Sequence, residues 1–264
     1  MIETKSFRYE EKERVATITL DRPDRLNALT FEVYRELTDL FRTLQNRREV
    51  GSVIVTGEGR GFCSGGDVKD IIGQLMGRDM AGLLEFTRMT CELVGNIRAL
   101  RKPVITALNG VVAGAGAMIA LASDIRIACP AARIAFLFVK VGLSGADMGA
   151  AFLLPRVVGL SKATEMLFTG DFVSAEEAEK IGLYNKLVPS EQLMNEAWQW
   201  AKKLAEGPGF GLAITKEMLN QEFNMGFTAA LEAEAQAQAI CMQHPDYNEA
   251  YQAFVEKRKA NFQK

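Results

Sequence analysis

The chain has 264 residues, of which 48% are hydrophobic, and its 31 basic residues nearly balance its 33 acidic ones, for a net charge of −2. A chain of this length can bury a large core, either as one α/β domain or as a domain with an appendage. Because the net charge is small, no strong field is available to hold nucleic acid or an anionic membrane surface, and we expect neither kind of partner.

The N-terminus and the cysteines bear on cellular location. The first fifteen residues, MIETKSFRYEEKERV, are too charged for a signal peptide. The apolar runs are all broken well before the about 20 residues that a transmembrane helix needs. The four cysteines have no metal-ligand spacing and are Cys63, Cys91, Cys129 and Cys241. We therefore expect free thiols, no metal site and a cytoplasmic protein.

The first elements are two strands, a helix and a third strand. Alternating residues over 6–9 and 15–20 predict the strands, which a turn at 21–24 closes. Thr30 can cap a helix with apolar positions at Val33, Leu37, Leu40 and Phe41. A short buried strand at 53–56 then leads into a loop of small residues, and a helix is expected from about Asp67.

The same order of elements is repeated further along the chain. A helix over 83–100 precedes a strand at 104–108, an Asn109-Gly110 turn and the small residues of 113–117. An apolar helix is expected to begin at Met118. Two successive units of strand, small-residue loop and helix favour a right-handed βαβ arrangement.

The remainder of the chain is predicted to be mainly helical. Helices are expected over 162–169, after the capping residue Ser174 as far as Gly182, and from Pro189-Ser190 to about residue 204. From residue 211 to residue 264 the pattern is helical throughout. We therefore predict a core over residues 1–200 and a helical region over residues 201–264.

The two small-residue loops suggest a binding site made from backbone groups. A helix N-terminus carries unpaired N–H groups that can hold an anion or a developing oxyanion. If the helices after Gly65-Gly66 and around Ala115-Gly116 begin at the same end of a sheet, two amides face one point. Such a pair can hold a carbonyl oxygen that becomes an enolate, with each donor contributing about 3 kcal/mol in the transition state. The alternative is that small residues here merely allow tight helix–strand packing.

Other motifs point to rival functions. The glycines of 57–61 do not form the dinucleotide-binding pattern, and no Walker lysine follows them. Residues 61–65 fit a nucleophile elbow with Cys63 as the nucleophile, and the sole histidine, His244, lies downstream as such a hydrolase requires. A Cys-dependent hydrolase is therefore an alternative, although a lone histidine between helical segments is more often a surface residue.

Six segments, in order, carry a resemblance to a known family: Asp21-Arg22-Pro23 with Asn27-Ala28, Gly61 to Val68, Lys102 to Ile105 with Asn109-Gly110, Ser123-Asp124-Ile125, Leu167 to Gly170, and Ala253 to Arg258. With these the chain resembles the crotonase, or enoyl-CoA hydratase/isomerase, superfamily over nearly its whole length. The resemblance implies an α/β fold with a ββα-repeat spiral core and a helical C-terminal trimerisation region. It also implies an acyl-CoA thioester substrate, no cofactor beyond the CoA of that substrate, and a homotrimer or a dimer of trimers.

The resemblance also assigns roles to individual residues. It implies an oxyanion hole from the backbone N–H groups of Gly66 and Ala115. The family more often has glycine at the second position, but the N–H is what matters. Phe254 and Lys257 are expected to help hold the CoA nucleotide across a subunit boundary. Further substrate or CoA contacts are expected at Arg25, Asn27, Ala28, Ser64, Gly65, Asp67 and Val68.

Departures from the family pattern indicate the reaction. Hydratases of the family carry two glutamates that activate water, and the matching positions here are Met118 and Phe138, which cannot transfer a proton. Counted back from Leu153 to Arg156, Asp147 matches the acid/base aspartate of the isomerase branch, although counted forward from Gly142 it lies one residue late. We expect Asp147 to transfer the proton, with Met118 and Phe138 as a dry pocket wall that raises its pKa.

Enoyl-CoA isomerisation is thus the favoured function, since a double-bond shift needs one base and no water. Asp147 could instead be only a helix cap or a loop carboxylate. The alternative functions are an enoyl-CoA hydratase, an acyl-CoA hydrolase or dehalogenase, and a non-catalytic acyl-CoA binder. The acyl group and the pathway, whether fatty-acid or aromatic-acid metabolism, stay open.

Overall fold

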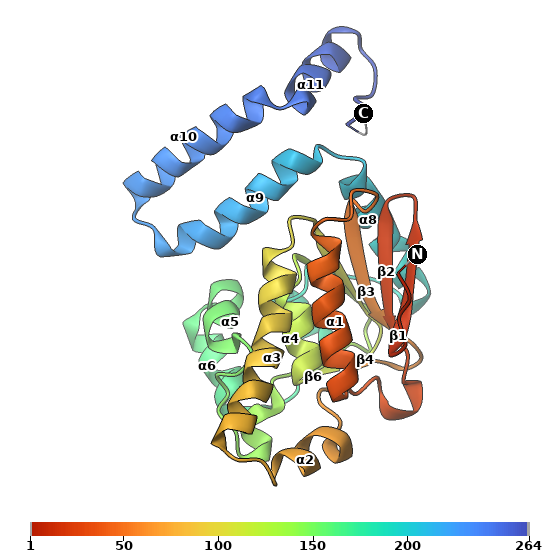
Figure 1. Ribbon diagram of the computed structural model, residues 1–264, viewed down its shortest axis with the longest axis vertical. Helices are drawn as coiled ribbons and strands as arrows, with labels where there is room; N and C mark the ends of the chain where they lie inside the picture. Colours follow the sequence, from red (N-terminus) through yellow and green to blue (C-terminus); the bar gives the residue numbers. More distant parts are fainter. Residues whose placement is uncertain (1, 263–264) are drawn as a thin grey trace.

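The computed structural model describes residues 2–262 and contains two β-sheets (Figure 1). The larger sheet has the strand order β1-β2-β3-β5-β7-β9, with β1 antiparallel to β2 and every other pairing parallel. Its strands are Phe7–Lys12, Val15–Leu20, Ser52–Gly57, Val104–Leu108, Ile125–Ala128 and Lys186–Leu187. The strands predicted near residues 7, 15, 53 and 104 are therefore confirmed.

A smaller parallel sheet has the order β4-β6-β8 and comprises Gly61–Cys63, Val111–Ala113 and Ile134–Ala135. Each of these strands follows a strand of the larger sheet, and β4 and β6 each lead into a helical segment, which gives the expected ββα repeat. The turns between the sheets are tight. A Cβ atom at Gly110 would lie 2.1 Å from the carbonyl oxygen of Arg60, so only glycine fits there.

Helices cover the sheets on both sides. α1 (Phe31–Leu44) and α3 (Met80–Ala99) lie side by side, with α4 (Ala115–Ala122) behind them (Figure 1). Every residue of α4 is buried. α8 (Leu193–Ala205) packs against the larger sheet, where the Ser52 hydroxyl donates to the Ala201 carbonyl at 2.8 Å. The remaining core helices are α5 (Ala150–Val158), α6 (Leu160–Thr169) and α7 (Ala175–Lys180).

The predicted helix caps are confirmed. The side chains of Thr30 and Ser174 accept hydrogen bonds from the amides of Val33 and Glu177. Asp67 caps a π-helix, Val68–Ile72, that continues into the short α2 (Gly73–Leu75). One boundary differs, because α4 begins at Ala115 and not at Met118. The small residues of 115–117 form its first turn, since their low volume lets this turn pack against β4.

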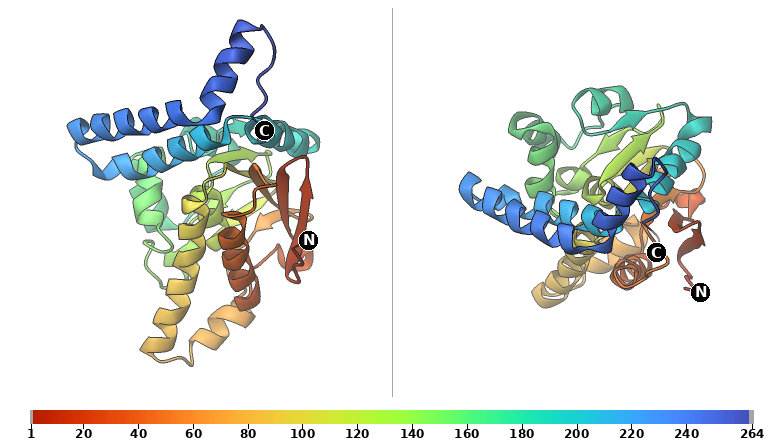
Figure 2. Two further views of the ribbon diagram at one scale, coloured as in Figure 1. Left: turned by 45° about the horizontal axis from the view of Figure 1, so that its top comes forward. Right: turned by 90° about the horizontal axis from the view of Figure 1, so that it is seen from above.

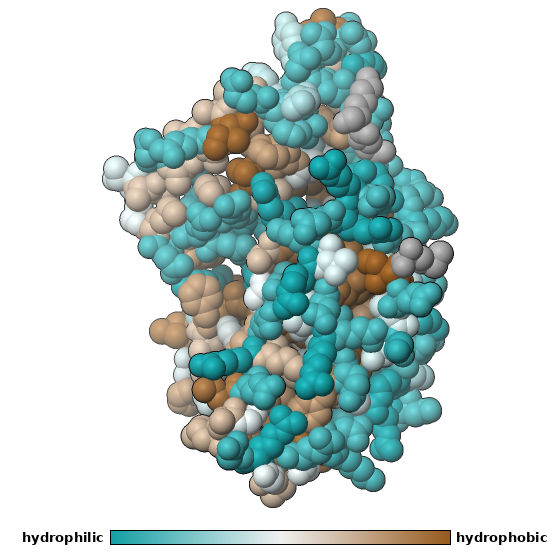
Figure 3. Space-filling model, in the orientation of Figure 1, coloured by the Kyte–Doolittle hydropathy of each residue, from teal (hydrophilic) through white to brown (hydrophobic). Residues whose placement is uncertain are grey.

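The C-terminal helices form a separate layer above the core (Figures 1 and 2). They are α9 (Gly209–Gln221), α10 (Phe227–Gln243) and α11 (Pro245–Val255). The ammonium of Lys216 anchors α9, since it donates to Asp124 at 2.8 Å and to two core carbonyl oxygens at 3.2 Å. α10 buries none of its residues, and Figure 3 shows apolar surface over the α9–α10 hairpin.

Three features of this region differ from the prediction or qualify it. The boundary expected after residue 200 falls inside α8, whose apolar face continues onto the sheet through Ala201 and Ala205. Helix ends at Val255, and residues 256–262 follow without helix; the last two residues of the predicted helical run lie outside the described part. Over residues 2–262, no helix has the length and apolarity to cross a bilayer.

Candidate active site

The two small-residue loops lie against each other, as the sequence predicted. β4 and β6 are neighbouring parallel strands, so the loops that follow them leave the small sheet at the same end. A Cβ atom at Gly65, where φ is +105°, would lie 3.7 Å from the Ala115 nitrogen. A Cβ atom at Gly116 would lie 2.4 Å from the Cys63 carbonyl oxygen. We call the segments 64–67 and 113–116 together the amide corner.

The corner presents two unpaired N–H groups. The Leu29 amide donates to the Gly65 carbonyl and the Asp67 amide donates to the Leu29 carbonyl, both at 2.8 Å, which turns the Gly66 N–H away from this pairing. Ala115 is the first residue of α4, so its N–H has no intrahelical acceptor. Within residues 2–262 neither amide donates to a backbone oxygen. Both are therefore available to a ligand oxygen.

Arg22 stabilises the amide corner through hydrogen bonds, a role that the sequence did not predict. Its guanidinium donates to the Ala28 carbonyl at 2.6 Å and to the Asp67 carboxylate at 3.1 Å. The other Asp67 oxygen accepts the amides of Lys69 and Asp70. The Asp21-Arg22-Pro23 segment was the available signal in the sequence. It contributed to the family resemblance, but it did not indicate that Arg22 contacts Asp67.

The predicted CoA contacts near the corner separate into buried and accessible groups. Asn27 is 1% exposed, and both hydrogens of its amide group go to the carbonyls of Glu58 and Gly61. Its side chain therefore shapes the loop and has no hydrogen left to donate to CoA. Among the other predicted contacts, Ala28 and Gly65 are buried, whereas Arg25 and Val68 are exposed. Ser64 is partly buried, and its hydroxyl donates to the Arg25 carbonyl at 3.3 Å.

Asp147 is half-buried in the loop before α5. One of its carboxylate oxygens accepts the Met148 amide at 2.8 Å, and the other has no hydrogen-bond donor among the described residues. Burial raises the pKa of Asp147, although the bond from Met148 opposes this shift. Left-handed backbone at Met148 and Gly149 turns the chain into α5. Asp147 thus combines a free oxygen with increased basicity, as acid/base chemistry requires.

Asp147 lies near α1 and α3. Its charge contributes to raising the pKa of both Tyr34 on α1 and Cys91 on α3, after burial as the main cause. The predicted wall residues are apolar and enclosed: Met118 exposes no surface, and Phe138, in the 3₁₀ helix Leu137–Val141, is 7% exposed. Neither side chain can carry a proton.

The Cys-dependent hydrolase does not fit the structure. Cys63 is fully buried, and this burial raises the pKa of its thiol to about 12, so no thiolate forms near neutral pH. His244 lies between α10 and α11, where its ring stacks on Phe210 and its Nδ1 accepts the Asp246 amide. Sequence order suggested a pair, whereas the fold uses the histidine as a helix cap.

Phe254 and Lys257 lie far from the amide corner of their own chain. Phe254, on α11, is 84% exposed, and α11 lies at the opposite end of the molecule from α2 (Figures 1 and 2). Lys257 follows α11 and has left-handed backbone. Within one chain these two residues do not join the site.

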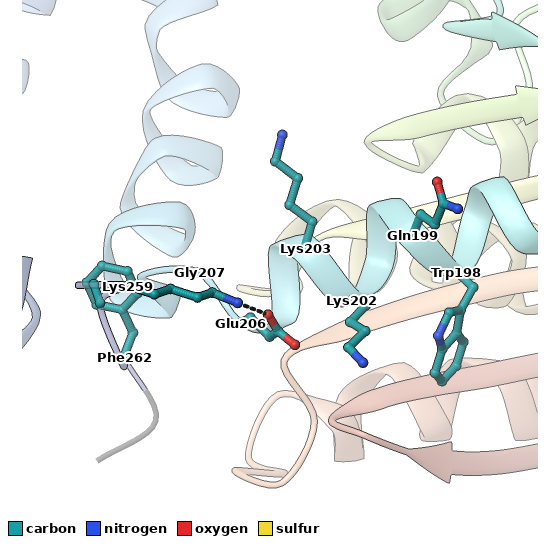
Figure 4. A pocket seen from close by; sticks show the side chains of 9 residues that line it. Trp198, Gln199, Lys202, Lys203, Glu206, Gly207, Lys259 and Phe262 are labelled. Atoms are coloured by element: carbon teal, nitrogen blue, oxygen red, sulfur yellow. Dashed lines mark hydrogen bonds and ion pairs between the residues drawn. The ribbon is translucent and has the colours of Figure 1, made fainter. Parts of the chain in front are cut away.

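A pocket of about 460 Å³ lies between α8 and the C-terminal segment (Figure 4). Basic side chains line it, and Lys259 pairs with Glu206 at 2.7 Å. None of the predicted site residues belongs to its lining. Residues 2–262 also contain no group of three or more His, Cys, Asp or Glu side chains arranged to hold a metal ion.

The chain is similar to known proteins over nearly its whole length. The chain is 36% identical over 248 residues to the 1,2-epoxyphenylacetyl-CoA isomerase of Escherichia coli (strain K12), covering 94% of each protein. It is 33% identical over 253 residues to a short-chain-enoyl-CoA hydratase of Clostridium acetobutylicum, covering 95% of this chain and 94% of the relative.

A solved structure from Streptomyces coelicolor A3(2), provisionally assigned as an enoyl-CoA hydratase, superimposes with a TM-score of 0.96 and 51% identity, covering 99% of this chain and 95% of that one. Residues 10–264 match the model of the enoyl-CoA hydratase/isomerase family. With an α/β core that repeats the ββα unit and a helical C-terminal region, the chain is a member of the enoyl-CoA hydratase/isomerase family, the crotonase superfamily.

Proposed function

We propose that this protein is an acyl-CoA isomerase that shifts a double bond through an enolate, with Asp147 as its single acid/base. The observation that carries the proposal is the combination of two free amides in the corner with one half-buried carboxylate. The thioester carbonyl oxygen would accept the N–H groups of Gly66 and Ala115. These donors are fixed before the reaction, so they stabilise the charge that develops on this oxygen.

Proton transfer follows from the free oxygen of Asp147. It would remove a proton from a carbon made acidic by the thioester, while the corner holds the dienolate, and return the proton to a different carbon. Apolar residues at positions 118 and 138 supply no second acid or base, which disfavours the addition of water. The proposed chemistry needs no group beyond this chain and the CoA thioester.

CoA binding would use the accessible residues beside the corner. Arg25 and the apolar side chain of Val68, which is 68% exposed, flank the amides. Phe254 and Lys257 would reach the CoA nucleotide of a neighbouring subunit in a homotrimer or dimer of trimers. Exposed apolar residues of α10 support such an assembly, since a helix that buries nothing in one chain has a face left for another.

A panel of enoyl-CoA thioesters, with products identified by mass spectrometry, tests the proposal. Isomerisation leaves the mass unchanged, hydration adds the mass of water, and hydrolysis releases free CoA. We expect isomers as products, and expect Asp147→Asn to lower kcat by about 10²–10⁴-fold with little change in acyl-CoA affinity. Asn keeps an oxygen to accept the Met148 amide, so loop geometry is preserved. Unchanged isomerisation by this variant, or a hydrated product, would contradict the assignment.

A further inference from the structure

Tyr34 differs from the other enclosed tyrosine of the chain. Its side chain is 3% exposed, yet no residue in the described range forms a hydrogen bond with its hydroxyl. Tyr184 is equally buried, but its hydroxyl donates to the Ala132 carbonyl at 2.7 Å. A buried hydroxyl normally has a partner, because losing its hydrogen bonds to water costs about 1–3 kcal/mol.

The Tyr34 hydroxyl is also not sealed inside the core. The unpaired side-chain polar atoms that are fully enclosed within residues 2–262 are Asn109 Oδ1, Arg156 Nε and Glu222 Oε1. The Tyr34 oxygen is not among them, so it keeps a small accessible surface although the rest of the residue is enclosed. The hydroxyl oxygen therefore keeps some contact with the accessible surface of the molecule.

Tyr34 lies in the first turn of α1, which begins two residues after Leu29, the residue that pairs with Gly66 of the amide corner. The Phe86 ring of α3 packs edge-on against it, with ring centroids 6.0 Å apart. Burial raises the pKa of Tyr34 far above its usual value, and the nearby groups Cys63 and Asp147 raise it further. Cys63 directly precedes the amide corner. The phenol is thus a neutral hydrogen-bond donor near both the corner and the carboxylate.

We propose that the Tyr34 hydroxyl determines substrate specificity by donating a hydrogen bond to an oxygen atom that the acyl group carries in addition to its thioester carbonyl. The substrate class would then be an oxygen-bearing acyl-CoA, preferred over the matching hydrocarbon. This inference rests on the proposed function, which seats the acyl group between the amide corner and Asp147. The Asp147 carboxylate is not the hydrogen-bond partner of the Tyr34 hydroxyl. The structure has no Tyr34–Asp147 hydrogen bond, and one Asp147 oxygen already accepts the Met148 amide. A binding site with an unpaired hydrogen-bond donor disfavours ligands that have no acceptor for this donor.

Equilibrium binding of unreactive acyl-CoA pairs tests this inference without requiring turnover. The probes are phenylacetyl-CoA with its three ring-hydroxylated isomers, and hexanoyl-CoA with its 6-hydroxy derivative, measured by calorimetry. The wild-type protein is expected to bind one hydroxylated probe about 10-fold more tightly than its parent. Tyr34→Phe should abolish this preference while leaving the affinity for the parent unchanged.

Tyr184→Phe is the matched control, because it removes the same atom from an equally buried tyrosine. It should lower the thermal stability and keep the preference. Loss of affinity for both members of a pair in Tyr34→Phe would overturn the inference, as would a preference that survives in this variant or is absent from the wild type. Failure of isomerisation would not affect these results, so the inference and the proposed function can fail separately.

Discussion

The amide corner and the Asp147 loop form the two halves of the candidate site, and they are built in opposite ways. The corner uses backbone groups held by close contacts, with Gly116 and the Cys63 carbonyl leaving no space for a Cβ atom. The Asp147 loop, residues 142–149, is largely exposed and contributes one side chain. A backbone donor depends on position and not on residue identity. We infer that the corner carries the chemistry common to the family, while the loop sets the reaction.

After the loss expected for Asp147→Asn, removing one N–H of the corner is expected to have the largest effect. Proline is favoured at the first position of a helix, so Ala115→Pro deletes the donor with little cost to α4. We expect kcat to fall by about 10²–10³-fold, the usual loss for one oxyanion donor. Steady-state kinetics on the best thioester of the panel provides the measurement.

Ala115→Gly is the control for this variant, because it keeps the N–H and restores the residue that is more common in the family. Its kcat should stay within about threefold of the wild type. Equal losses in the two variants would mean that the side chain of Ala115, and not its amide, matters.

Crowding the corner should affect stability more than chemistry. A methyl group at Gly116 meets the Cys63 carbonyl, whose backbone cannot easily move, so Gly116→Ala should lower the free energy of unfolding by about 1–3 kcal/mol. Gly95→Ala in α3 provides the matched control, since a Cβ atom there meets nothing within 4 Å. It should stabilise the helix by about 0.5–1 kcal/mol. Urea unfolding of both variants gives the comparison, and a stable Gly116→Ala protein would show that the corner is not tightly packed.

The smallest expected effect is on thermal stability, which is lowered when the half-buried carboxyl of Asp147 ionises. Because its pKa is higher in the folded state than in the unfolded chain, the folded state binds this proton more tightly. Stability contributed by this group is therefore lost as pH rises through its pKa. Asp147→Asn should have a higher Tm than the wild type at pH 7, and the difference should shrink as acidification neutralises the wild-type carboxyl. Thermal scans across this pH range would contradict the prediction if the variant were less stable at pH 7.

The sequence by itself determined the elements of the site, because local patterns govern them. Thr30 and Ser174 could be read as helix caps, since a cap needs only an oxygen beside the first free amides. The small residues at 65–66 and 113–117 identified both loops of the corner for a similarly local reason, and the absence of ionisable groups at positions 118 and 138 could be read directly.

Only the tertiary structure decided which residues meet. Pairing of β4 with β6 brings together loops that lie about fifty positions apart in the sequence, and no local pattern encodes that distance. The fold also separated Cys63 from His244, enclosed Asn27, and placed Tyr34 near Asp147. Tyr34 lies on the buried face of α1, and no local pattern marks it as a site residue. Whether its hydroxyl finds a partner depends on packing between α1, α3 and the Asp147 loop, and burial of a polar atom is decided by all of its neighbours in space.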